Sequence, residues 1–264
     1  MDACIQKRRS IKKKETYFDE LPKEIIDRIG NPKLVIAIDI ETLGWPEHSS
    51  KKGHIGKFGF YTVKDDAAIE FPRIIQIAWV IGECRKDSDT ISKCFLIQPE
   101  GFQIEWKATH FHGISNEMAT ANGTKLKDVL NEFMKDAMKA YDEGGMIIAH
   151  QIEFDAGVIY EELGRCGFTD LREKWMMMVR QKGFCTMNPS LGRWLLQCNG
   201  EDVGPTTVQH ALGLIKMAKL ILPEQDEIKH HDAEFDAKLC RMVFVALVEK
   251  AIIGIGPSEI KPFA

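Results

Sequence analysis

The sequence has little net charge and no regular cysteine pattern. Its 264 residues carry 35 Lys and Arg against 39 Asp and Glu, which gives a formal net charge of −4. This balance excludes a broadly basic protein that coats nucleic acid, but not a nuclease, whose catalytic carboxylates make the sum more negative. The seven Cys residues are scattered and contain no Cys-x-x-Cys pair. Neither a zinc ribbon nor a disulfide framework is therefore indicated.

Long apolar runs are also missing. The first 30 residues contain the basic run 7–14 but no apolar block typical of a signal peptide, and charged residues interrupt the longest apolar stretches well short of a bilayer span. We therefore expect an intracellular protein, cytoplasmic or nuclear, without a membrane anchor. The basic run is either a solvated tail or a segment that contacts phosphates or directs the chain to the nucleus.

What is present is the composition of a folded domain. Hydrophobic residues make up 44% and charged residues 28% of the chain, which is typical of a globular protein. We expect a polar N-terminal extension with one short amphipathic helix over residues 1–30, one folded domain over 31–252, and a tail over 253–264. Residues 46–71 form a long polar connection, read as an inserted loop or hairpin.

The order of apolar patterns predicts an α/β domain. The β-branched run 34–41 reads as a buried central strand, and runs 74–81 and 91–97 follow it without an intervening helix, which indicates an antiparallel meander. Spacing of i, i+3 and i+4 predicts a helix over 125–141. The later elements are expected at 146–150 (strand), 154–166 (helix), 183–187 (strand), and 189–197, 206–217 and 233–250 (helices).

Two acids end the first strand. Asp39 and Glu41 are two residues apart, so the strand period of two places both side chains on one face. Buried acids side by side repel each other, and a hard divalent cation between them relieves the repulsion. The alternative is a pair of solvated turn residues, against which the flanking apolar run argues.

Two further acids lie at the starts of predicted helices. Asp155 follows a buried strand and falls in the first turn of a helix, where a helix N-cap is the alternative role. Asp236 lies early in the C-terminal helix between Ala233 and Ala237. These small residues would let the helix face with Asp236 approach another backbone closely, which again favours a metal near a buried acid.

Taken together, three short motifs resemble a known family. Asp39-Ile40-Glu41-Thr42, the segment 150–155 and the spacing His231-x-Ala-x-x-Asp236 resemble, in their order, the exonuclease motifs of the DEDDh branch of the DnaQ-like 3′→5′ exonucleases. The resemblance runs from about residue 34 to residue 249. It also includes the segments 72–78, 112–114 and 185–186.

The resemblance implies an RNase H-like fold, in which helices flank a five-stranded mixed β-sheet. It also implies two divalent cations, Mg²⁺ or Mn²⁺, held by four acids: Asp39, Glu41, Asp155 and Asp236. His231 matches the general base, because the family's His stands five residues before its last Asp. The position four residues before, which defines the Tyr branch, is Asp232 here.

The resemblance also marks residues expected to bind substrate. These are Thr42, Leu43, Trp45, His112 and His150. The family commonly reads Thr-Thr-Gly-Leu after its Glu, with the Leu against the terminal base. Here Trp45 stands in that place and offers a larger stacking face, or else packs as a loop aromatic. Gln151 stands where the family often has Asn.

The inserted segment 46–71 interleaves cations with aromatic residues, among them Lys57, Phe58, Phe60 and Tyr61. Such a mixture suits a lip for single-stranded nucleic acid. An additional β-hairpin with ordinary core aromatics is the alternative.

The expected function is a metal-dependent exonuclease that acts on single-stranded DNA or RNA with a free 3′ end and releases nucleoside 5′-monophosphates. Two alternatives stay open, an enzyme specific for very short oligonucleotides and a catalytically silent nucleic-acid-binding domain. The sequence does not decide between RNA and DNA, nor whether the chain forms a homodimer.

Overall fold

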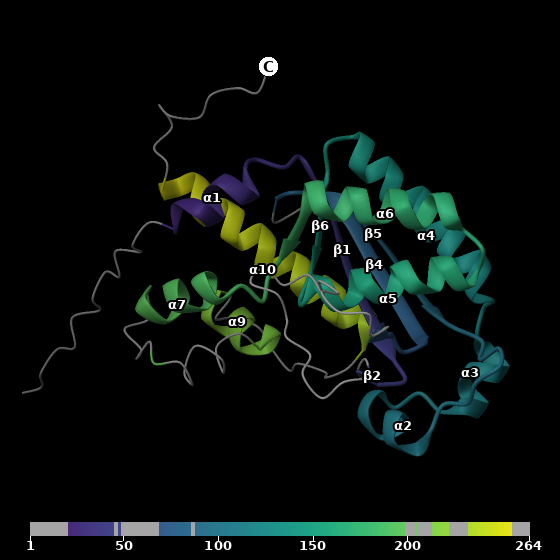
Figure 1. Cartoon of the computed structure of the whole chain (residues 1–264). Helices are drawn as coiled ribbons and strands as arrows, with labels where there is room; N and C mark the ends of the chain where they lie inside the picture. The colour runs from purple at the N-terminus through teal and green to yellow at the C-terminus, as the bar shows by residue number, and fades with distance from the viewer. Residues whose placement is uncertain are drawn as a thin grey trace, which may run out of the picture.

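A mixed five-stranded sheet forms the centre of the molecule (Figure 1). The computed structural model describes residues 21–44, 47–48, 69–85, 88–198, 204, 213–221 and 232–254. The sheet has the order β5-β4-β1-β6-β7, and a separate two-stranded ladder joins β2 to β3. The strands are β1 (Leu34–Thr42), β2 (Glu47–His48), β3 (Ile69–Glu70), β4 (Ile74–Glu83), β5 (Thr90–Leu96), β6 (Met146–Ala149) and β7 (Gly183–Cys185).

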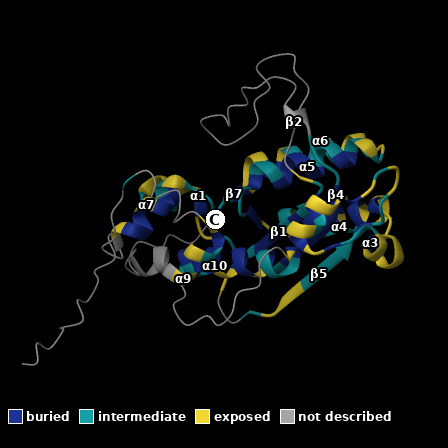
Figure 2. Ribbon diagram, turned by 90° about the horizontal axis from the view of Figure 1, so that it is seen from below, coloured by how far each residue is buried: buried dark blue, intermediate teal, exposed yellow. Residues whose placement is uncertain are grey.

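Helices cover both faces of this sheet. They are α1 (Lys23–Ile29), α2 (Trp106–His112), α3 (Asn116–Asn122), α4 (Leu126–Asp142), α5 (Ile152–Arg165), α6 (Thr169–Lys182), α7 (Pro189–Cys198), α9 (Leu214–Ile221) and α10 (Ala233–Gly254). Figure 2 shows that the helices turn their buried residues toward the sheet and their exposed residues outward.

Strand β1 is the central strand of the sheet, and its two neighbours pair with it in opposite directions. β4 runs antiparallel to it, with Asp39 opposite Ala78 and Glu41 opposite Gln76. β6 runs parallel to it, with Ile38 opposite Ala149. The register shifts between Glu41 and Thr42. The strand therefore changes its pairing at the point where its acids stand.

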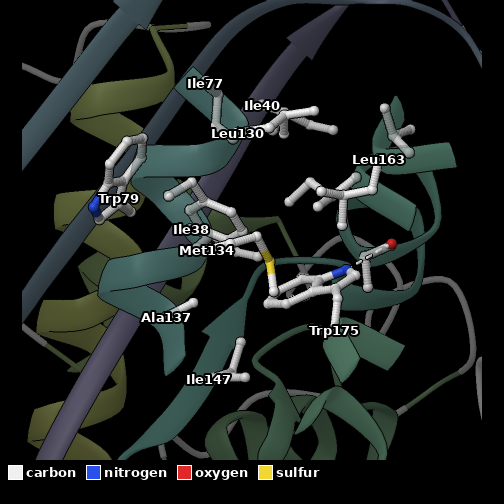
Figure 3. Packing of buried hydrophobic residues seen from close by; sticks show 14 of the residues in the cluster. Ile38, Ile40, Ile77, Trp79, Leu130, Met134, Ala137, Ile147, Leu163 and Trp175 are labelled. Carbon is white, nitrogen blue, oxygen red and sulfur yellow. Dashed lines mark hydrogen bonds between the residues drawn. The ribbon is translucent and has the colours of Figure 1, made fainter. Parts of the chain in front are cut away.

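Successive side chains of β1 point to opposite faces of the sheet and so belong to two separate core layers. Ile36, Ile38 and Ile40 face a cluster formed with α4, α5 and α6. Phe133 of α4 makes edge-to-face contacts there with Trp79, at 5.3 Å between ring centroids, and with Trp175, at 5.2 Å. Figure 3 shows Trp79 and Trp175 on either side of Met134 and Ile38. Large apolar side chains thus pack α4 and α6 against the sheet.

The opposite face of β1 begins apolar and ends acidic. Val35 and Ala37 pack with α1, α7, α9 and α10, and the next residues on this face are Asp39 and Glu41. Ala233 and Ala237 of α10 are buried against Ala78 and Val80 of β4. The small residues therefore permit the close approach of α10 that the sequence predicts.

The predicted fold class is confirmed, and so is the antiparallel meander of β1, β4 and β5. Among the helices of the described residues, three were not predicted. α2 and α3 have seven residues each, too few for a clear period. α6 does carry a signal, since its buried Trp175, Met178 and Val179 have helical spacing.

Several predicted features lie in parts of the chain that the structure does not describe. The basic run 7–14, Trp45, the cations and aromatics of the inserted segment and His231 lie outside the described residues. At the ends of that segment, β2 pairs with β3 antiparallel. The short helix expected before residue 30 is α1, and its Ile25 and Ile29 are buried in the second core layer. Within the described residues, no helix is both long enough and apolar enough to cross a membrane.

Candidate active site

Three carboxylates from two elements converge at the acidic end of β1. Asp39 and Glu41 extend from the strand, and Asp236 comes from the first turn of α10. One oxygen of each lies within 4.8 Å of the others. Residues almost 200 positions apart in the sequence thus form a group able to hold one cation, and carboxylate oxygens are the ligands that hard divalent metals prefer.

Asp155 lies next to this group, close enough to interact electrostatically with Asp39 and Glu41, although it is not one of the three acids within 4.8 Å. It is 3% exposed in the first turn of α5. Burial raises its pKa well above the usual value, and Glu41 and Glu153 raise it further, while its own amide and that of Ile40 act in the opposite direction. The N-cap residue of α5 is Gln151, so the N-cap alternative for Asp155 is wrong.

The mutual repulsion of the acids favours a bound cation at this site. Burial raises the pKa of Asp39 well above its usual value, and the carboxylates of Asp155, Asp236, Glu41 and Asp232 add to this in that order. Burial, followed by Asp236 and Asp232, raises the pKa of Glu41 to about 7. Every charged neighbour that shifts these two groups is an acid. A divalent cation would remove the mutual repulsion and keep all of them ionised.

Hydrogen bonds at the start of α10 hold Asp236 in place. The amide of Ala233 donates to Oε1 of Gln76 at 3.0 Å, and Gln76 is the partner of Glu41 in the β1–β4 register. Oδ1 of Asp232 accepts from the amide of Phe235 at 3.1 Å, as a helix N-cap does. The strand with Glu41 and the helix with Asp236 are therefore joined directly through Gln76.

The sequence did not reveal the roles of Gln76 and Asp232. Gln76 fell inside the matched segment 72–78, and Asp232 was used only to choose between the His and Tyr branches. A buried amide on an otherwise apolar strand is the signal that would have identified Gln76, which is 8% exposed.

The predicted substrate-binding residues Thr42 and Leu43 form a closed turn after the acids. The hydroxyl of Thr42 donates to the carbonyl of Gly44 at 2.7 Å, and the amide of Leu43 donates to the carbonyl of Arg73 at 3.1 Å. The half-buried Leu43 side chain packs on a small cluster that includes Ile75 and Ala108. The turn is thus anchored to both β4 and α2.

The two predicted histidines occupy different surroundings. His150 is half-buried, and its Nδ1 lies 2.9 Å from Oγ1 of Thr186. That hydroxyl is buried and lies 3.6 Å from Sγ of Cys240, and the pKa of the Cys240 thiol is raised by burial first and also by Asp39 and Asp155. His150 is therefore linked through Thr186 to Cys240, whose thiol is within electrostatic range of two of the acids. The sequence had placed Thr186 only within a matched segment.

His112 lies at the end of α2. It is 9% exposed, and its Nδ1 accepts a hydrogen bond from the amide of Ile114 at 3.1 Å. This bond closes the turn at Gly113, where the backbone is left-handed with a φ of 76°. Its role in substrate binding stays a prediction.

Comparison with known proteins identifies the family of the chain. The sequence pattern of the exonuclease family RNase T matches residues 36–244. The chain belongs to this exonuclease family. The predicted relationship to DnaQ-like exonucleases is therefore confirmed, and with it the assignment as an exonuclease. This family depends on divalent metal, which the carboxylate group suits.

Solved structures share the fold at low identity. Exonuclease I of E. coli in complex with a dT13 oligonucleotide superimposes with a TM-score of 0.60 and 15% identity, over 84% of this chain and 42% of that protein. The zinc-bound complex of E. coli exonuclease I with single-stranded DNA gives 0.53 and 14%, over 86% and 42%. This chain thus spans less than half of exonuclease I. No curated protein matches the sequence.

Proposed function

We propose that the chain is a metal-dependent 3′→5′ exonuclease that releases nucleoside 5′-monophosphates from the free 3′ end of single-stranded DNA or RNA. One observation carries the proposal: in a chain of the exonuclease family, Asp39, Glu41 and Asp236 converge within 4.8 Å. The structures of E. coli exonuclease I with dT13 and with dA16 support a single-stranded substrate.

The proposed cofactors are two Mg²⁺ or Mn²⁺ ions held by Asp39, Glu41, Asp155 and Asp236. Bound ions of this kind supply Lewis-acid activation of the phosphate and of the attacking water. The chain's own contribution is a rigid ligand set, since Gln76 ties β4 to α10 and the amide of Ile40 acts on Asp155. Fixed ligands of this kind avoid reorganisation during the reaction.

His231 is the proposed general base, and it would take the proton of the attacking water. It directly precedes Asp232, whose carboxylate raises the pKa of both Asp39 and Glu41. An imidazole with an ordinary pKa of about 6.5 accepts a proton at neutral pH. The terminal nucleotide would lie against Thr42, Leu43 and Trp45, with His112 and His150 as further contacts.

The first experiment is degradation of 5′-labelled single-stranded oligonucleotides with Mg²⁺ or Mn²⁺, using matched DNA and RNA sequences. The wild type should produce a ladder that shortens from the 3′ end, and Asp236→Asn should abolish it. Glu234→Gln is the matched control, because this acid on the same helix is paired with Ser92 and Lys238. No shortening by the wild type, or equal shortening by Asp236→Asn, would refute the proposal.

A second experiment isolates the general base. His231→Ala should lower kcat strongly while Mn²⁺ binding, measured by calorimetry, stays within a factor of two. A parallel loss of metal binding and turnover would assign His231 to the metal site instead.

A further inference from the structure

Helix α2 exposes two large aromatic side chains to solvent. Trp106 is 75% exposed and Phe111 is 65% exposed, and these are the two aromatic residues among the exposed large hydrophobic side chains of the described residues. Water contact with so much aromatic surface is unfavourable. A surface of this kind generally marks a binding site.

The exposed residues of α2 form two neighbouring i, i+4 pairs, which contain aromatic rings and one lysine. Trp106 and His110 are one helical turn apart and stack with their ring centroids 5.2 Å apart and their planes inclined by 19°. Lys107 and Phe111 form the neighbouring row at the same spacing, and Lys107 is exposed. The exposed Glu105 precedes the helix. The helix therefore offers ring faces together with one ammonium group.

The inner side of α2 is fixed to the turn that follows the catalytic acids. Ala108 and Ile104 pack in the same cluster as Ile75 and Leu43, and Leu43 is two residues from Glu41. Figure 1 shows α2 at the end of the sheet where β1 finishes. The helix that carries the exposed aromatic residues is thus anchored to the turn that follows Asp39 and Glu41.

We propose that Trp106, Lys107, His110 and Phe111 form a stacking surface for the bases of a single-stranded nucleic acid whose 3′ end is held at the acidic site. The proposal rests on the proposed function. Aromatic rings stack on any base, so such a surface binds without sequence preference, while Lys107 contacts a phosphate.

The size of the surface favours nucleic acid over a protein partner. A stable protein interface buries roughly 1,200–2,000 Å² in total, far more than four side chains of one short helix present. A base needs a single ring face. The packing of α2 against Leu43 also places the helix near the turn that follows the acids.

The test compares Trp106→Ala, Phe111→Ala and the double variant with wild type on single-stranded dT20. Ile91→Ala is the matched control, because Ile91 is 61% exposed on the edge strand β5. Each single change should raise KM about fivefold to tenfold and the double change further, with kcat within a factor of two. Ile91→Ala should leave both constants unchanged.

Binding without turnover separates this inference from the proposed function. With EDTA present, fluorescence anisotropy of labelled dT20 measures affinity even if the chain cleaves nothing. The double variant should bind at least tenfold more weakly than wild type and Ile91→Ala. Equal affinity of the double variant and wild type would overturn the inference. If the double variant also lost a self-association that wild type shows on sedimentation, the surface would be assigned to a second copy of the chain.

Discussion

Helix α5 carries two buried acids on one face, and the groups around them are opposite in charge. Asp155 and Glu162 lie seven residues apart, which is two helical turns, and both are buried. Oε1 of Glu162 accepts from Nε of Arg73 at 2.7 Å and from the amide of Ile74 at 3.2 Å, and it lies 3.2 Å from Arg165. The charged neighbours that shift the pKa of Asp155 are the acids Glu41 and Glu153.

The difference shows that the charge of the neighbouring groups distinguishes a structural buried carboxylate from a candidate metal ligand. Glu162 is neutralised by the protein itself and holds both the start of β4 and the preceding Arg73. The carbonyl of Arg73 accepts from the amide of Leu43. Asp155 faces carboxylates, so its ionised form requires a cation from outside the chain. Burial alone would not have separated the two roles, because the nature of the neighbours decides.

The largest expected effect comes from neutralising Asp155. Asp155→Asn should lower exonuclease turnover by about 10³-fold or more, since a metal contribution of several kcal/mol is lost. Without metal, the same variant should be as stable as wild type or more stable, because repulsion with Glu41 falls. Turnover and EDTA melting curves measure the two effects. A clear loss of metal-free stability would contradict the repulsive role.

Neutralising Glu162 should have the reverse effect on stability, which we expect to fall. Glu162→Gln should lower the free energy of unfolding by about 2 kcal/mol, less than the 3–5 kcal/mol of a fully buried broken pair, because the Arg73 and Arg165 side chains are 28% and 35% exposed. Urea denaturation checks this. The control is Glu132→Gln, a 44% exposed partner of Lys93, which should cost less than 1 kcal/mol. Equal losses in both variants would remove the contrast.

The third prediction concerns pH without metal. The pKa of Glu41 is about 7 in the folded chain against 4.5 for the ordinary group, so the folded state binds more protons between these values. Its contribution to stability is therefore complete below pH 4.5 and is lost as the pH rises through 7, by about 1–2 kcal/mol after allowance for solvent screening.

Melting temperature in EDTA should accordingly fall from pH 5 to pH 8 in wild type and fall less in Glu41→Gln. Because metal binding needs the ionised acids, added Mg²⁺ should raise the melting temperature more at pH 8 than at pH 5. A metal effect that is the same at both pH values would contradict the proposed ligands.

The smallest effect is expected at the start of α5. Gln151 is the non-glycine residue with positive φ in the described part of the chain, at φ 82° and ψ 50°. Asn adopts this region more readily than Gln, so Gln151→Asn should stabilise the chain by a few tenths of a kcal/mol to about 1 kcal/mol. Thermal unfolding measures it. A destabilised Gln151→Asn variant would show instead that the longer amide makes a contact of its own.

This backbone conformation also gives a physical reading of one departure from the family pattern. Asn at this position suits a left-handed residue before α5, and Gln151 holds the same conformation without a side-chain cap on the helix. The start of α5, and with it Asp155, is therefore set by the backbone rather than by the amide side chain.

The sequence by itself determined the five strands of the main sheet and most of the described helices, and it singled out four acids as candidate ligands. Local patterns carry that information: the β-branched run before Asp39, the period of two that pairs it with Glu41, and the small residues on either side of Asp236. The order of the motifs then identified the family. Each of these signals lies within a few neighbouring residues.

Only the tertiary structure decided what surrounds each acid. Gln76 meets Ala233 across 157 positions, and Arg73 meets Glu162 across 89. No local period records such contacts, because they depend on which strand and helix pack together. For the same reason the exposure of Trp106 and Phe111 was invisible in the sequence, where an aromatic residue is equally compatible with a core and with a binding surface.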